Sequence, residues 1–249
     1  MQSAALSSDT ETKRLAPSTA ASPRERLDVL ALELAQSIKL SHRAAHGSPV
    51  QTRLKKLDGF IHSAYHHFEE VSKEKIAISQ ATEWVLDNFY VIEQAICQVR
   101  EGMPAEYYRR LPQVALDGQE NVARIYILSA ALASAIESSL DVDQLNRFIQ
   151  AYQKVDVLKI GEVWALPLML RLSMLETLAT ALANLTQIPF TALHPLPIPQ
   201  ADGSDAPPSA DETLVINAIL SLRFLATQDW KVFFERVSFV EQTLRGDPL

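Results

Sequence analysis

The sequence is poor in several residues on which common protein classes depend. Cys97 is its only cysteine, so no intramolecular disulfide can form and a reducing compartment is expected. Only seven of the 249 residues are glycine, whereas a β-sandwich or barrel needs many tight turns. Arg171 and Glu176 interrupt the most apolar stretch, 163–185, which is thereby unlike the uncharged run of a membrane span. A buried core helix is therefore expected there.

Positive charge and the familiar enzyme motifs are also scarce. The net charge is −7, and the short basic groups do not form the patch that nucleic-acid binding requires, so no nucleic-acid partner is expected. The sequence contains no glycine-rich phosphate loop, no nucleophile elbow and no paired-cysteine motif. His62 and His66 are four residues apart but lack the internal Glu or nearby Cys of a metal motif. We therefore expect no catalytic residue, cofactor, metal site or direct small-molecule ligand.

The sequence is rich in apolar residues that recur every three to four positions. Such spacing places them on one side of a helix, and no strand pattern stands out. The sequence therefore predicts an all-α fold, a bundle of about eight to nine helices without a sheet. The expected helices cover about 23–47, 52–75, 79–101, 104–111, 121–138, 142–154, 160–187, 210–226 and 228–245.

Composition divides the chain into segments. Residues 1–22 are mostly Ser, Thr and Ala without periodicity, which predicts a disordered tail. A Ser-Pro pair then begins the helical domain, 23–188. Six of the thirteen prolines lie in 189–209, which is typical of a loop or linker. Residues 210–249 are predicted to form a helical pair that packs on the same domain.

The stretch EWVLDNFYVIEQAI, 83–96, has the carboxylates and aromatic rings of a sugar-cleaving site. When the stretch is projected on a helical wheel at 100° per residue, the acids and most of the aromatic rings lie on different sides of the helix. Only Asp87 lies at the border, beside Trp84. Catalytic carboxylates must flank the scissile bond from opposing sides, which two acids on one helix cannot do. An amphipathic core helix is therefore the preferred interpretation. Asn88 lies inside the apolar arc and will need hydrogen-bond partners.

Arg171 lies in the apolar stripe of the helix expected at 160–187. Because a lone buried charge is costly, Arg171 should meet a carboxylate from another helix, with Asp87 the first candidate, or a cluster of carbonyls. The alternative is that its guanidinium reaches a nearby surface. Trp84 and Trp164 also lie on apolar stripes, which favours core packing over sugar stacking.

Several segments together resemble a known family. They are EWVLDNFYVIEQAI, MPAEYYRRLP, ARIYILSAAL, FIQAYQKVDVLKIGEVWALPLMLRLSMLETL, ADETLVINAILSLRFLATQDWKVFFERVSFVEQTL and RGDPL. In this order they resemble the N-terminal region of bacterial cyclic β-1,2-glucan synthases, from about residue 79 to the end apart from the proline-rich stretch. IGEVWALPLMLR is the most specific part. The chain departs from the family pattern at Arg110, Ala123 and Thr177, where an acid, a proline and an asparagine are usual.

The resemblance implies the function. Members of this family are long inner-membrane proteins that use UDP-glucose, and their catalytic motifs lie downstream of the region matched here. It therefore implies a non-catalytic helical N-terminal module on the cytoplasmic side of the bacterial inner membrane. Its partners would be the downstream catalytic and membrane domains of the same enzyme. The alternative is a stand-alone helical interaction or scaffold protein without enzymatic activity.

The last expected helix suggests where such a module would dock. Phe239 lies about 130° from the centre of the apolar stripe of this helix, by the 100° rule. It therefore has no evident place in the core. We interpret Phe239 as part of a docking surface for the downstream domains, with a single exposed apolar residue as the alternative.

Overall fold

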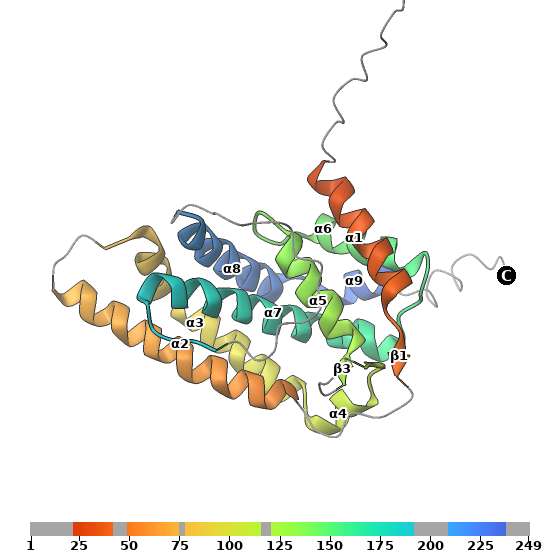
Figure 1. The fold of residues 1–249 in the computed structure, drawn as a ribbon, viewed down its shortest axis with the longest axis horizontal. Helices are drawn as coiled ribbons and strands as arrows, with labels where there is room; N and C mark the ends of the chain where they lie inside the picture. Colours follow the sequence, from red (N-terminus) through yellow and green to blue (C-terminus); the bar gives the residue numbers. More distant parts are fainter. Residues whose placement is uncertain (1–21, 42–48, 75–77, 116–120, 192–208, 238–249) are drawn as a thin grey trace, which may run out of the picture.

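The computed structural model describes residues 22–41, 49–74, 78–115, 121–191 and 209–237, and it confirms the all-α prediction. These residues form nine helices (Figure 1). The helices are α1 (Pro23–Ser37), α2 (Pro49–Lys73), α3 (Gln80–Gly102), α4 (Ala105–Arg110), α5 (Arg124–Ala135), α6 (Val142–Gln153), α7 (Ile160–Thr186), α8 (Ser209–Thr227) and α9 (Trp230–Val237). Residues 1–21 of the predicted tail, most of the proline-rich stretch and Phe239 lie outside the described residues, whereas Ser22 caps α1.

A small sheet corrects the expectation of a fold with no sheet. Its strands are β1 (Leu40–Ser41), β2 (Gln113–Val114) and β3 (Val122–Ala123), paired antiparallel in the order β1-β2-β3. Two-residue strands are too short to show the alternating pattern that identifies a strand in a sequence. The sheet also replaces the end of the first predicted helix, because α1 ends at Ser37 and the chain then enters β1.

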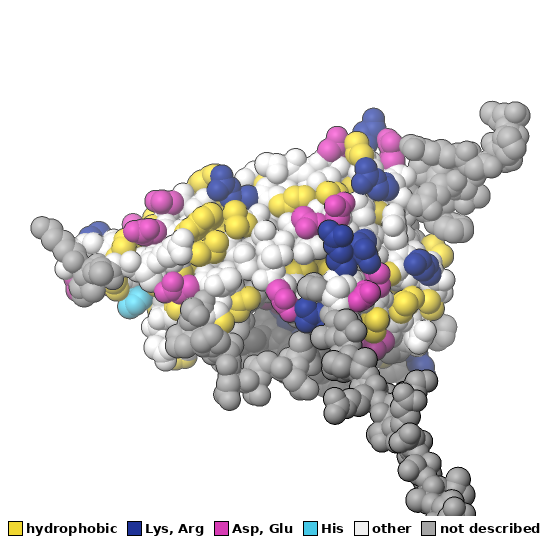
Figure 2. Space-filling view, turned by 90° about the horizontal axis from the view of Figure 1, so that it is seen from above, with side chains coloured by type: hydrophobic (Ala, Val, Ile, Leu, Met, Phe, Trp, Pro, Cys, Tyr) yellow, Lys and Arg dark blue, Asp and Glu magenta, His cyan; other side chains and the backbone are white. Residues whose placement is uncertain are grey.

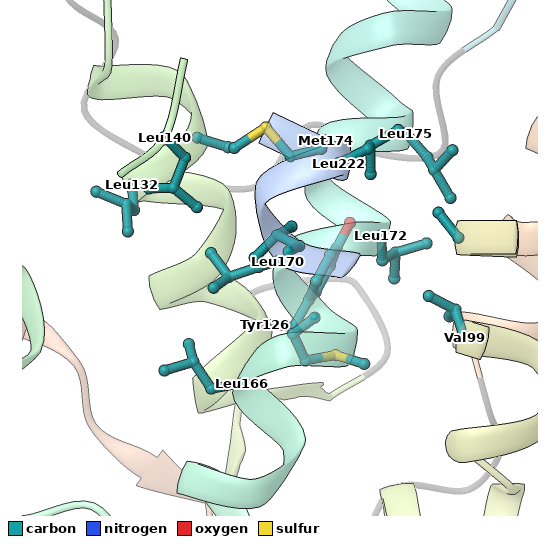
Figure 3. Close-up of a cluster of buried hydrophobic side chains, with 14 of the residues drawn as sticks. Val99, Tyr126, Leu132, Leu140, Leu166, Leu170, Leu172, Met174, Leu175 and Leu222 are labelled. Carbon is teal, nitrogen blue, oxygen red and sulfur yellow. The ribbon is translucent and has the colours of Figure 1, made fainter. Parts of the chain in front are cut away.

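Helix α7 is the centre of the fold. It packs against α2, α3, α5, α8 and α9, which lie around it in Figure 1. Its apolar residues occur on all sides, which is the pattern of a helix buried in a core. Figure 3 shows buried side chains of α7 meeting Val99 of α3, Tyr126 of α5 and Leu222 of α8. The positions of the neighbouring helices are thus fixed by their contacts with α7.

Local interactions set several helix ends and one close approach. Ser22 and Glu25 form a reciprocal capping box at the start of α1, and Asp141 and Gln144 form another at α6. Gly102 ends α3 where that helix approaches α7, and a Cβ added there would lie only 2.8 Å from a methyl carbon of Leu168. A larger residue at this position would therefore require the side chain of Leu168 to move.

Charged side chains join α1 to its neighbours. Arg147 of α6 binds Asp28 of α1 at 2.5 Å, and Arg26 of α1 binds Glu137 at 3.0 Å. Figure 2 shows a face where acidic and basic side chains lie close together with hydrophobic side chains between them. Exposed ion pairs of this kind contribute little to stability. The helices are therefore held mainly by the apolar core.

Candidate functional site

The turn from α6 into α7 carries an unusual group of exposed apolar side chains. We call this group the α6–α7 corner; it consists of Lys154, Val155, Val157, Lys159, Ile160 and Trp164. The exposed fractions of its four apolar residues run from 45% for Val157 to 60% for Trp164. Ile160 and Trp164 are four residues apart and so share one face of α7. Exposed apolar groups that cluster in this way are typical of interaction surfaces.

The exposure of Trp164 corrects the prediction that this residue packs in the core. Trp164 lies on the same helical face as Arg171, which is seven residues further along α7. At Arg171 that face is covered by the end of α8 and by Trp230. Trp164 is two turns away and remains 60% exposed. The apolar stripe was identified correctly, but its burial depends on how far the covering helix extends.

A buried ion cluster holds the corner in place. Arg124, at the start of α5, is 1% exposed and binds the fully buried carboxylate of Glu162 with two bonds of 2.8 and 2.5 Å. The guanidinium also binds Asp156 and donates to the carbonyl of Val157 at 3.2 Å. One arginine thus ties the α6–α7 connection and the first turn of α7 to α5. Bidentate pairing of this kind fixes geometry as well as charge.

The cluster determines the electrostatics of the corner. Burial alone lowers the pKa of Arg124, but the bonds and charge of Glu162 raise it, and the net result is a pKa above the ordinary value. Burial raises the pKa of Tyr152, whose ring lies 5.8 Å from the guanidinium, to about 12. Arg124 therefore stays charged and pairs with the buried Glu162 and the partly exposed Asp156.

The sequence offered a pattern that would have revealed Arg124. It precedes the apolar run IYILSAAL, just as Arg171 interrupts the apolar stripe of α7. The cost of burying an unpaired charge applies equally to both residues. Arg124 would then have been expected to pair with a carboxylate. Glu162 is 38 residues away along the chain, so periodicity alone could not identify it as the partner.

Arg171 is buried, as predicted, but Asp87 is not its partner. Asp87 is exposed on α3, whereas Arg171 donates to the carbonyls of Pro167 at 2.9 Å and Leu225 at 2.5 Å. Leu225 belongs to the last turn of α8, where unpaired carbonyls carry the negative end of the helix dipole. Arg171 therefore caps α8, which corresponds to the predicted carbonyl cluster. Burial lowers its pKa to about 10.

Asn88 bends α3, and Trp84 takes part in the bend. Asn88 has non-helical backbone angles (φ −116°, ψ 15°) and its side-chain amide donates to the carbonyl of Trp84 at 2.9 Å. Its oxygen accepts from Arg223 of α8 at 3.5 Å. A side chain that enters the helical hydrogen-bond ladder is a known cause of a kink. The predicted need of Asn88 for partners is thus met, and Trp84 is half-buried against the core.

A second charged cluster joins α2, α5 and α7. Tyr126 donates to Glu176 at 2.6 Å, and Arg53 donates to both Tyr126 and Glu176 at 3.2 Å. Burial raises the pKa of Glu176, although the bonds from Tyr126 and Arg53 oppose the shift. Burial and the charge of Glu176 raise the pKa of Tyr126 well above its ordinary range. The three side chains are hydrogen-bonded to one another inside the fold, as expected for a structural cluster.

No group of three His, Cys, Asp or Glu side chains that could hold a metal ion occurs within the described residues. The thiol of Cys97 donates to Glu101 at 3.2 Å, and this bond raises the pKa of the thiol, which disfavours the nucleophilic thiolate. The fold and its surface thus define an all-α protein with internally paired charges and an exposed apolar corner.

One helix in the described ranges, α7, is long and apolar enough by length and composition to cross a membrane. In its most apolar window, 78% of the residues are buried inside the protein, as expected for a core helix.

Comparison with known proteins reveals one region of similarity. No protein-family model matches the chain. Over 102 residues the chain is 35% identical to the cyclic beta-(1,2)-glucan synthase NdvB of Rhizobium meliloti (strain 1021). The similar stretch covers 41% of this chain and 4% of that enzyme, so the chain spans only a small fraction of its relative. The chain therefore contains a region related to part of a glucan synthase.

Proposed function

We propose that this chain is a non-catalytic helical module of a membrane glucosyltransferase related to cyclic β-1,2-glucan synthases. The similarity to NdvB carries the proposal, because it is confined to 4% of that enzyme and leaves nearly all of it for other domains. The internally paired Arg124 and Glu176 clusters support a structural role, since their charged groups are engaged within the fold. The downstream catalytic and membrane domains would use UDP-glucose, and the module would lie on the cytoplasmic side of the bacterial inner membrane.

The first test asks whether the chain has a nucleotide-sugar site of its own. We expect isothermal titration calorimetry to show no binding of UDP-glucose tighter than about 1 mM, which corresponds to about −4 kcal/mol. The expectation rests on the lack of a phosphate loop in the sequence and of a metal-binding cluster in the described residues. Tighter binding, or release of UDP on incubation, would contradict a non-catalytic role.

The second test places the module in an enzyme. The stretch of the Rhizobium meliloti synthase that is similar to this chain would be replaced by the corresponding stretch of this chain. We expect the chimera to retain synthesis of cyclic β-1,2-glucan, measured in cell extracts. An unrelated helical bundle of equal length inserted at the same place serves as the control and should abolish synthesis.

A second function is favoured by one observation. The exposed apolar residues of the α6–α7 corner fit a stand-alone helical interaction or scaffold protein without enzymatic activity. The chimera separates the two functions. A chimera that accumulates at the normal level in the membrane but makes no glucan would favour the stand-alone protein.

A further inference from the structure

The α6–α7 corner combines exposed apolar groups with exposed positive charge. Val155, Val157, Ile160 and Trp164 are all at least 45% exposed. Lys154 directly precedes Val155, Lys159 lies between Val157 and Ile160, and both lysines are exposed as well. Indole rings, aliphatic side chains and lysines with long apolar stems are the groups that settle at the boundary between water and lipid.

The buried ion cluster determines which charges the corner presents. Four charged residues occur between 154 and 164, two of them basic and two acidic. Glu162 is fully buried on Arg124, and Asp156 also binds that guanidinium. The two lysines are exposed, and the negative charge of Asp156, whose side chain is 37% exposed, is paired with Arg124. The corner is therefore locally positive on a chain whose net charge is −7.

This charge separation bears on the kind of partner. An anionic surface repels most of an acidic protein and attracts it only where positive charge is concentrated. Each lysine near an anionic bilayer favours binding, and the effect decreases within one Debye length. Binding through the corner would thus place this end of the protein against the anionic surface and keep the rest of the acidic protein away from it.

The size of the apolar surface favours lipid over protein. The four apolar side chains of the corner are about half exposed. Together they present an apolar surface area on the order of a few hundred Å². A stable protein interface buries about 800 Å² on each partner. A bilayer needs no matched partner surface, since apolar side chains can enter the headgroup layer individually. The corner therefore fits a shallow contact with lipid better than a stable interface with a second protein.

We propose that the α6–α7 corner binds the surface of a bilayer that contains anionic lipids. Trp164 and Ile160 enter the headgroup layer, and Lys154 and Lys159 contact the lipid phosphates. Helix α7 itself stays in the protein core, so the contact is peripheral. The proposal goes beyond the proposed function, because it rests on the corner alone and does not require the relation to a glucan synthase.

The experiment measures binding of the full chain to lipid vesicles by co-sedimentation and by tryptophan emission. Vesicles of phosphatidylcholine with phosphatidylglycerol are compared with vesicles of phosphatidylcholine alone. We expect binding to the anionic vesicles that weakens with added salt. We expect a blue shift of emission, and this shift should disappear in Trp164→Phe if residue 164 is the reporter.

Separate variants remove the apolar part and the charged part of the proposed contact with lipid. Trp164→Ala should weaken binding by at least about tenfold, and the double change of Lys154 and Lys159 to Gln by about thirtyfold at low salt. Ile160→Ser is a second apolar variant, for the case that the change at Trp164 disturbs the fold. Unchanged circular dichroism and denaturation midpoints show that each variant remains folded.

Matched controls come from other parts of the surface. Tyr90 is 60% exposed on α3, and Lys55 and Lys56 are exposed on α2. Tyr90→Ala and the double change of Lys55 and Lys56 to Gln should leave vesicle binding unchanged. The proposal is overturned if the chain does not bind anionic vesicles, if it binds neutral vesicles equally well, or if the corner variants bind as the wild type does. It is also overturned if Trp164→Ala instead abolishes self-association in gel filtration, because the corner would then be a contact between two copies.

Discussion

Replacement of Glu162 tests whether the buried ion cluster holds the start of α7. Glu162 is fully buried and binds Arg124 through both oxygens, and one of these oxygens also accepts the backbone N–H of Lys159 at 2.9 Å. Glu162→Ala removes the charge and all three acceptor contacts. It leaves the guanidinium of Arg124 buried with Asp156 as its remaining carboxylate partner.

The expected magnitude follows from these contacts. Removal of one partner of a buried ion pair costs about 3–5 kcal/mol, and the contact with Asp156 places the cost near the lower limit, about 3 kcal/mol. A cost of this size is a large part of the 5–15 kcal/mol typical of native proteins. For a chain of this length it lowers the melting temperature by about 6–12 °C.

Urea denaturation followed by circular dichroism measures the change in the free energy of unfolding. Removing both charges with Arg124→Met and Glu162→Leu should cost less than Glu162→Ala alone, because no buried charge remains unpaired. Glu83→Gln, on the exposed face of α3, is the control and should change stability by less than about 0.5 kcal/mol. A loss below about 1 kcal/mol for Glu162→Ala would refute the reasoning, since Arg124 would then not depend on its carboxylate partner.

Four further predictions concern other parts of the molecule. Arg171→Met should destabilise the fold less than Arg171→Ala, because Met fills the buried space without a charge. Equal decreases in melting temperature for the two variants would show that the hydrogen bonds of Arg171 to the carbonyls contribute more to stability than its packing does. Burial raises the pKa of Glu176, so its protonated form favours folding below the unfolded pKa and this contribution is lost as the pH rises through the folded pKa. The stability of the wild type minus that of Glu176→Gln should therefore fall from about pH 4 toward neutrality, and a rise in urea titrations would mean that pairing with Arg53 outweighs burial. Gly102→Ala should change stability by less than about 1 kcal/mol, because the new methyl group meets the flexible end of Leu168 and Ala favours the helix; a loss above about 2 kcal/mol by the same assay would show that Leu168 is held in place. Phe239→Asp should change stability by no more than about 0.5 kcal/mol if Phe239 belongs to a docking surface, and unfolding of the chain would assign it to the core.

The helices could be predicted from the sequence because helical periodicity is a local property. Apolar residues at three- and four-residue spacing identified α2, α3, α6, α7 and α8 to within a few residues of their observed bounds. The need of Asn88 for partners was visible for a similar reason, since a polar residue interrupted a regular arc. The small sheet could not be predicted, because strands of two residues show no pattern of their own, and residues 40–41 pair with residues 113–114, which are distant in sequence.

The candidate site depended on the tertiary structure. The sequence identified Trp164 and Arg171 as members of one apolar face, but only the position of α8 and α9 decided that Arg171 is covered and Trp164 is exposed. The sequence also showed that Arg171 needs hydrogen-bond partners. One of them is the carbonyl of Leu225, 54 residues away along the chain, in place of the expected Asp87. At the α6–α7 corner, Arg124 pairs with both acids, whereas the lysines and the apolar groups of the corner are exposed. A sequence determines which side of a helix is apolar, whereas burial and ion pairing depend on which other segment reaches that side in space.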